Sequence, residues 1–107
     1  MKVAIPMFKD RISPLFSTAP EALLVQTEGG RVCGSWKINL ARLSPTERRV
    51  KFLGLGIEAL FCGGIDEATR RWFERQGIHV EDNRMGNAME ILERHLYASC
   101  SERLNET

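Results

Sequence analysis

The sequence has no long apolar run and almost no net charge. It carries 15 Lys and Arg residues against 14 Asp and Glu residues, a formal net charge of +1 over 107 residues. This balance creates no general field that would attract nucleic acid or an anionic membrane. No apolar stretch approaches the roughly 20 residues that a membrane-spanning helix needs, and the stretch before Pro6 is too short for a signal peptide. We therefore expect a cytoplasmic protein that binds neither nucleic acid nor membranes.

Patterns typical of disulfide frameworks and zinc sites are absent as well. The three cysteines, Cys33, Cys62 and Cys100, are odd in number and far apart, and the chain has no CxxC, HxH or HExxH spacing. The sequence therefore indicates neither a disulfide framework nor a zinc site. Widely spaced, unpaired cysteines are consistent with a reducing cytoplasm.

Recognisable catalytic patterns are also missing. The chain shows no nucleophile–base pair and no Ser/His/Asp set, and the first predicted strand, KVAIP, has no carboxylate. A nuclease or phosphoryl-transfer enzyme needs several carboxylates that converge on metal ions, whereas Asp10 and Asp66 are expected in a loop and at a helix start. We expect a protein that is not an enzyme.

What the chain does have is the composition of one soluble domain, with 43% hydrophobic and 27% charged residues. A short strand over residues 2–5, closed by Pro6, is followed by an apolar loop over residues 6–20 that we expect to pack on the body. A hairpin follows, because the Gly29-Gly30 pair supplies the positive φ that a tight turn needs. Its strands cover residues 22–27 and 31–40.

Helices and strands alternate after the hairpin. Helix starts are predicted at Ser44-Pro45, where Ser44 can cap the first turn, near Ile65 and at Asn87; strands are predicted over residues 57–62 and 78–80. Period-two and helical spacing place Val32, Trp36 and Ile38 on one strand face, and turn Val50 and Leu53 inward.

This order predicts an α/β fold with a mixed five-stranded sheet flanked by helices. If the hairpin extends the sheet on one side of the first strand and strand 57–62 extends it on the other, the strand order is 3-2-1-4-5 with one antiparallel strand. The expected organisation is a single domain over residues 1–97 and a flexible C-terminal tail over residues 98–107.

The sheet order points to one place for a ligand. In α/β sheets, ligands bind outside the carboxyl ends of the strands, where the strand order reverses. That rule brings the loop after Ile5 beside Cys62-Gly63-Gly64. Glycines let a ligand approach the backbone, and the helix that follows would offer N–H groups and a positive dipole end to an anion. The same field would lower the pKa of Cys62 and favour a soft metal.

A simpler interpretation of these residues stays open at this point. Cysteine is among the most buried residue types and often acts as a small hydrophobe. The Gly63-Gly64 pair is equally well explained as a tight turn between a strand and a helix.

Three stretches resemble a known family: MKVAIPMFKDRISPLFSTA, LGLGIEALFCGGI and QGIHV. They are similar to the dinitrogenase iron–molybdenum cofactor biosynthesis family, of ribonuclease H-like fold, over nearly the whole chain to Tyr97. The resemblance implies a small non-catalytic protein, related to nitrogen fixation, that binds or carries an iron–sulfur or iron–molybdenum cluster or its precursor. It implies Cys62 as the metal ligand. The residues that it implies for shaping the pocket are Ser13, Phe16, Gly63 and Gly64.

One departure from the family pattern leaves two functions open. Members of nitrogenase systems often have a histidine after the Ser-Pro of the first loop, as a candidate cluster ligand, whereas this chain has Leu15 there and Ser17 where glycine is common. The first function is a cluster carrier, with further ligands from a homodimer mate or from the cluster itself and a cluster-assembly protein as partner. The second is an interaction or regulatory module of the same fold that has lost metal binding. His79 and His95 are expected to be surface or packing histidines.

Overall fold

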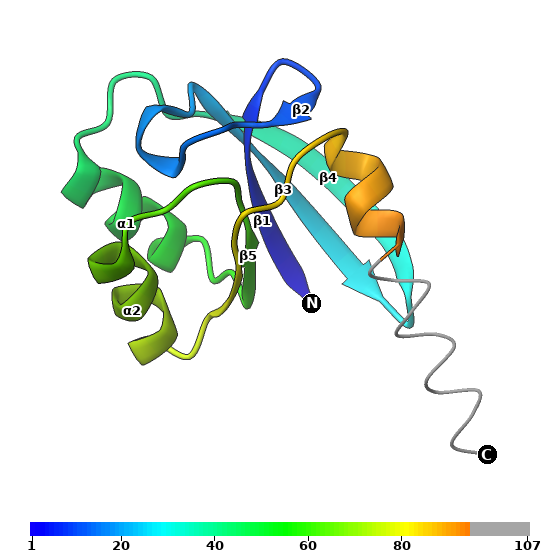
Figure 1. Cartoon of the computed structure of the whole chain (residues 1–107). Helices are drawn as coiled ribbons and strands as arrows, with labels where there is room; N and C mark the ends of the chain where they lie inside the picture. The colour runs from blue at the N-terminus through cyan, green and yellow to red at the C-terminus, as the bar shows by residue number, and fades with distance from the viewer. Residues whose placement is uncertain (95–107) are drawn as a thin grey trace.

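A central sheet is covered by helices on both faces (Figure 1). The computed structural model describes residues 1–94, and the last helix begins at residue 88. The predicted domain end at residue 97, the tail, His95 and Cys100 lie outside this range. The other elements are β1 (Lys2–Phe8), β2 (Arg11–Ile12), the short 3-10 helix η1 (Phe16–Thr18), β3 (Glu21–Glu28), β4 (Arg31–Asn39), α1 (Pro45–Gly54), β5 (Ala59–Phe61), α2 (Glu67–Arg75) and β6 (His79–Glu81).

The sheet is mixed and has six strands rather than the expected five. Its order is β4-β3-β1-β5-β6, with β2 paired to β1. Strand β1 runs antiparallel to β2 and β3 and parallel to β5, and β5 runs parallel to β6. The additional strand arises because part of the predicted loop after Ile5 pairs with the end of β1. The neighbours of the central strand are those that the hairpin and the alternating helices predict.

Pro6 does not end the first strand, contrary to the prediction. It lies inside β1 opposite Ala22, while β5 pairs with β1 only at Val3 and Ala4. The Pro6 carbonyl accepts a bond from Ser13 N at 2.9 Å. Because the N–H and C=O of one strand residue point to the same side, the position of the missing N–H faces Ser13, just past β2, and not β3. The proline therefore leaves the pairing of β1 with β3 intact.

The β3–β4 hairpin forms as predicted, with positive φ values of 57° at Gly29 and 82° at Gly30. Its ladder shifts register, because Gln26 pairs with Gly34 and Thr27 pairs with Val32. Cys33 is therefore an extra residue that makes a β-bulge. The bulge puts Val32 on the opposite face from Trp36, so the prediction that they share a face was wrong.

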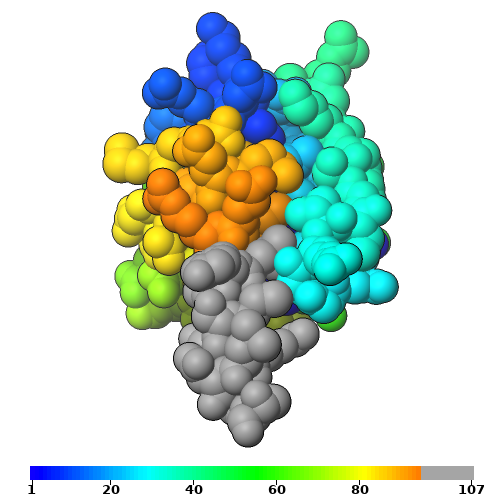
Figure 2. Space-filling view, turned by 90° about the vertical axis from the view of Figure 1, so that its right-hand side faces the viewer, coloured from blue at the N-terminus to red at the C-terminus, as the bar shows by residue number. Residues whose placement is uncertain are grey.

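Two apolar clusters fill the space between the sheet and the helices. Ala4, Leu24 and Leu60 face α1 and α2, and their cluster includes the ring of Phe52. Val3 and Val25 belong to the opposite face, which packs against helix 88–94. Helix 88–94 is visible in orange beside the hairpin in Figure 2. No helix within residues 1–94 is long and apolar enough to cross a membrane.

Helix α1 begins as predicted but turns a different side inward. Ser44 accepts a hydrogen bond from Glu47 N at 3.2 Å, which is the expected cap. Phe52 is fully buried, whereas Val50 and Leu53 are 59% and 40% exposed. The prediction that Val50 and Leu53 face inward was therefore wrong, because the side of the helix that carries Phe52 packs toward the sheet instead.

Candidate functional site

Two segments that are distant in the sequence meet at the carboxyl ends of β1 and β5, as the strand order predicts. Leu15 and Gly64 form an isolated parallel bridge. Gly64 N donates to the Pro14 carbonyl at 2.7 Å, and Phe16 N donates to the Gly64 carbonyl at 2.8 Å. We call residues 13–17 and 63–66 together the rim. The rim is held by main-chain bonds rather than by side chains.

The glycine pair makes this contact possible. A Cβ atom at Gly63 would lie 2.4 Å from the Ser13 carbonyl oxygen and 2.7 Å from that of Pro14. No residue other than glycine fits here without moving the loop. The sequence analysis expected a ligand to approach the backbone closely at this glycine pair. The backbone of Ser13 and Pro14 occupies that space instead, and the N–H of Gly64 already donates to the Pro14 carbonyl.

Cys62 points into the core rather than into the crevice. The residue is fully buried and belongs to the cluster beneath α1 and α2. The pKa of its thiol is raised to about 12, chiefly by burial and also by the nearby Asp82 carboxylate, while Arg70 acts in the opposite direction. The prediction of a lowered pKa was wrong, because desolvation outweighs any field from the helix that follows. A thiol that stays protonated inside the core is a poor metal ligand.

The N-terminus of α2 already has a negative group. The Asp66 carboxylate accepts hydrogen bonds from Thr69 N at 3.0 Å and from Thr69 Oγ1 at 2.7 Å. These bonds lower the pKa of Asp66 below its usual range. The side chain caps the helix, so the N–H groups that the sequence analysis offered to an anion are partly satisfied from within the chain.

Two residues of the rim, Ser13 and Phe16, are buried beneath its surface. Ser13 is 3% exposed, and its hydroxyl donates to the Leu15 carbonyl at 3.0 Å. Phe16 is buried between Phe52 and Phe73, with ring centroids 5.7 Å away in each case. Both residues shape the loop, but neither offers its side chain to a ligand at the surface.

A buried arginine fixes the same loop, and the sequence analysis missed it. Arg48 of α1 is 5% exposed and lies under the rim. Its guanidinium donates to the carbonyl oxygens of Phe16 at 3.3 Å, Ala19 at 2.6 Å and Leu40 at 3.2 Å. Burial lowers its pKa. A sequence signal existed, because Arg48 lies four residues before the buried Phe52 and thus on the same side of the helix.

The outer surface of the rim encloses a cavity of about 350 Å³, lined by Leu15, Ser17, Gly64, Ile65 and Asp66. Leu15 is 51% exposed, so the cavity opens beside an apolar side chain. Of the predicted site residues only Gly64 lines it. No group of three or more His, Cys, Asp or Glu residues within residues 1–94 is placed to hold a metal ion. The cavity suits contact with an apolar group, with one hydroxyl and one carboxylate at its edge.

The fold matches several solved structures. PH0822 superimposes with a TM-score of 0.86 at 20% identity, over 92% of this chain and 90% of that one. A protein of Methanocaldococcus jannaschii described as a candidate dinitrogenase gives 0.76 at 21% identity, over 92% and 89% of the two chains. A Thermotoga protein described as a candidate NifB protein gives a TM-score of 0.60 at 20% identity, over 94% and 87%. No family model and no curated protein matches the chain. At these identities the likeness shows the fold.

Proposed function

We propose that this protein is a non-catalytic interaction module with a nitrogenase-associated role, and that its rim binds a partner without coordinating metal through Cys62. The observation that carries the proposal is the position of the thiol. Cys62 is fully buried and its pKa is raised to about 12. The residue for which the resemblance implied a metal-binding role thus has no route to a cluster at the surface.

Two further observations support this function. Structural neighbours of the chain are described in terms of dinitrogenase and NifB, which favours a nitrogenase-associated role. At the rim, the half-exposed Leu15 stands where the family resemblance expects a histidine ligand. An exposed leucine beside a small cavity favours binding through apolar contact, because burying it in a complex removes apolar surface from water.

The cluster-carrier function remains the second candidate, because the same neighbour descriptions favour it. In that case the iron–sulfur or iron–molybdenum cluster is cargo. Its ligands would come from a partner or from the cargo itself, since the described residues bring together no set of soft donors. The two candidates therefore differ in one measurable property, which is whether the protein retains a cluster at all.

Anaerobic reconstitution with iron and sulfide distinguishes the two candidates. We expect wild type and Cys62→Ser to give the same absence of cluster absorbance after desalting. Leu15→His adds one imidazole to the rim, where residues 1–94 supply no set of further donors, and we expect it to stay without absorbance as well. A gain of absorbance in Leu15→His would favour the carrier, because the other ligands would then come from the cargo or from a second copy. Val50→His is the matched control, since Val50 is also exposed, at 59%, but lies on α1. Absorbance in the wild type that Cys62→Ser removes would establish the carrier and contradict the interaction module.

A further inference from the structure

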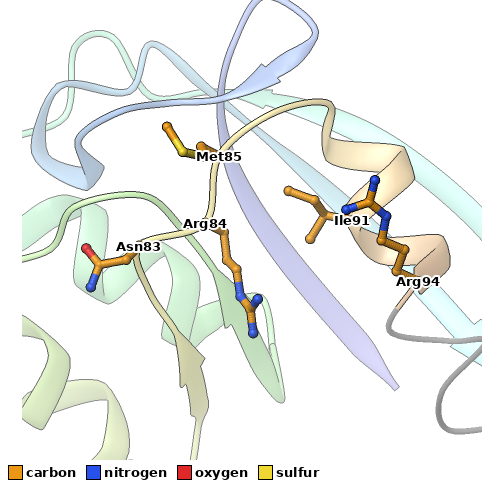
Figure 3. A pocket seen from close by; sticks show the side chains of 5 residues that line it. All are labelled: Asn83, Arg84, Met85, Ile91 and Arg94. Carbon is orange, nitrogen blue, oxygen red and sulfur yellow. The ribbon is translucent and has the colours of Figure 1, made fainter.

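A second cavity lies between helix 88–94 and the loop that follows β6. Its volume is about 340 Å³, and Asn83, Arg84, Met85, Ile91 and Arg94 line it. It shares no lining residue with the cavity at the rim. Figure 3 shows the two arginines on either side of Ile91, one from the loop and one from the helix. Both arginines line the cavity, but their guanidinium groups point in different directions in this view, so these exposed side chains would turn toward a shared ligand.

The charged residues that line this cavity are both arginines. Arg84 donates to the Glu81 carboxylate at 3.1 Å, and the His79 ring lies 3.3 Å from the other oxygen of Glu81. Within residues 1–94, Arg94 makes no ion pair or side-chain hydrogen bond. Of the two guanidinium groups, that of Arg84 is paired with Glu81 and that of Arg94 is free to bind an anion.

The loop that carries Arg84 is fixed by its backbone. Asn83 N donates to the Gly63 carbonyl at 3.0 Å, and Arg84 N donates to the Cys62 carbonyl at 2.9 Å. Asn83 adopts a left-handed φ of 56°, which asparagine tolerates better than most residues. These bonds hold the start of the Arg84 side chain in place, so a ligand would not have to order the main chain.

Two of the other three lining residues, Met85 and Ile91, are apolar, and the third is Asn83. Met85 is 83% exposed, and its flexible thioether can adapt to the body of a ligand. Ile91 is half-buried between the arginines. The volume falls at the lower end of the range for small-molecule sites, about 300–1,000 Å³. The lining therefore combines a cationic end with a small apolar surface.

We propose that this cavity binds a small organic phosphate, with the phosphate between Arg84 and Arg94 and the organic part against Met85 and Ile91. Guanidinium groups present several N–H donors in a planar fork that matches phosphate oxygens. Two such groups suit a dianionic phosphate better than a single carboxylate. The site lies outside the rim, so it goes beyond the interaction function proposed above and does not depend on it.

Titration of the ¹⁵N-labelled full chain with AMP, followed by NMR, tests the proposal. We expect saturable shifts of amides in residues 83–94, and no such shifts with adenosine, which lacks the phosphate. Arg84→Gln and Arg94→Gln should each weaken AMP binding about tenfold, the usual effect of losing a hydrogen bond to a charged group. Both side chains are exposed, so neither change is expected to disturb folding.

Arg75→Gln is the matched control, because it removes the same charge from an exposed position of α2, which covers the opposite face of the sheet from helix 88–94. We expect it to leave AMP binding unchanged. Equal binding of adenosine and AMP would overturn the proposal, as would an equal loss in Arg75→Gln, which would indicate attraction by net charge alone. Tighter binding of citrate than of AMP would overturn the assignment to a phosphate.

Discussion

Replacing Gly63 with alanine tests whether the rim is held together backbone to backbone. The new Cβ would lie 2.4 Å from the Ser13 carbonyl oxygen and 2.7 Å from that of Pro14. Both obstacles are main-chain atoms, which cannot rotate away as a side chain can. Relief requires the loop at residues 13–16 to move off the Gly63-Gly64 segment.

The cost of that movement follows from the contacts it breaks. Overpacking costs about 1–3 kcal/mol. Separation of the segments also breaks the bonds from Gly64 N to Pro14 O and from Phe16 N to Gly64 O, at about 0.5–1.5 kcal/mol each. We expect the free energy of unfolding to fall by about 2–6 kcal/mol, a large share of the roughly 5–15 kcal/mol typical of a domain.

Urea denaturation measures this loss, and amide hydrogen exchange at Phe16 and Gly64 locates it. Gly54→Ala is the matched control, because a Cβ there meets no atom within 4 Å and the residue ends helix α1. Alanine at that position should be neutral or stabilising by up to about 1 kcal/mol. A Gly63→Ala variant as stable as wild type, with both amides still protected, would refute the backbone-to-backbone description.

Two further changes test buried groups. Arg48→Met should lower the free energy of unfolding in urea by about 2–4 kcal/mol, because it removes the guanidinium donor from three buried carbonyls, of which that of Leu40 still accepts from Leu43 N; unchanged stability would mean that the cost of burying the guanidinium cancels its bonds. Burial raises the Cys62 pKa from 9.0 to about 12, so its contribution is complete below pH 9 and is lost as the pH rises from 9 towards 12. Between pH 8 and pH 10 the free energy of unfolding should therefore fall by about 1.4 kcal/mol more in wild type than in Cys62→Ala; equal falls would contradict the burial. In native protein at pH 8, Ellman's reagent should modify the exposed Cys33 and leave Cys62 unmodified.

Local sequence signals predicted most of the elements and their neighbours. Alternation of helix and strand after the hairpin predicted which strands flank the first one, and Gly29-Gly30 predicted the tight turn. Pro6 misled the prediction of the first strand's end, because its missing N–H would face Ser13 rather than β3, so the pairing with β3 continues past it. The bulge at Cys33 could not be predicted, because it is a change of register between two strands.

The candidate site was predicted in its location but not in its chemistry. The meeting of the first loop with Gly63-Gly64 follows from strand order alone. The state of the Cys62 thiol does not, because it depends on which face of the sheet the side chain joins and on how deeply the helices cover it. Arg48 was missed for a related reason: its partners are carbonyl oxygens of segments up to 32 residues away.

The bulge at Cys33 also matters for how the protein behaves in concentrated solution. Strand β4 forms one margin of the sheet, and no other strand within residues 1–94 pairs with its outer side. A straight edge strand can pair with the edge strand of a second molecule and so start polymerisation. An edge strand that has a bulge and also carries Lys37 pairs poorly in this way. The extra residue in β4 thus discourages the molecules from stacking into fibres.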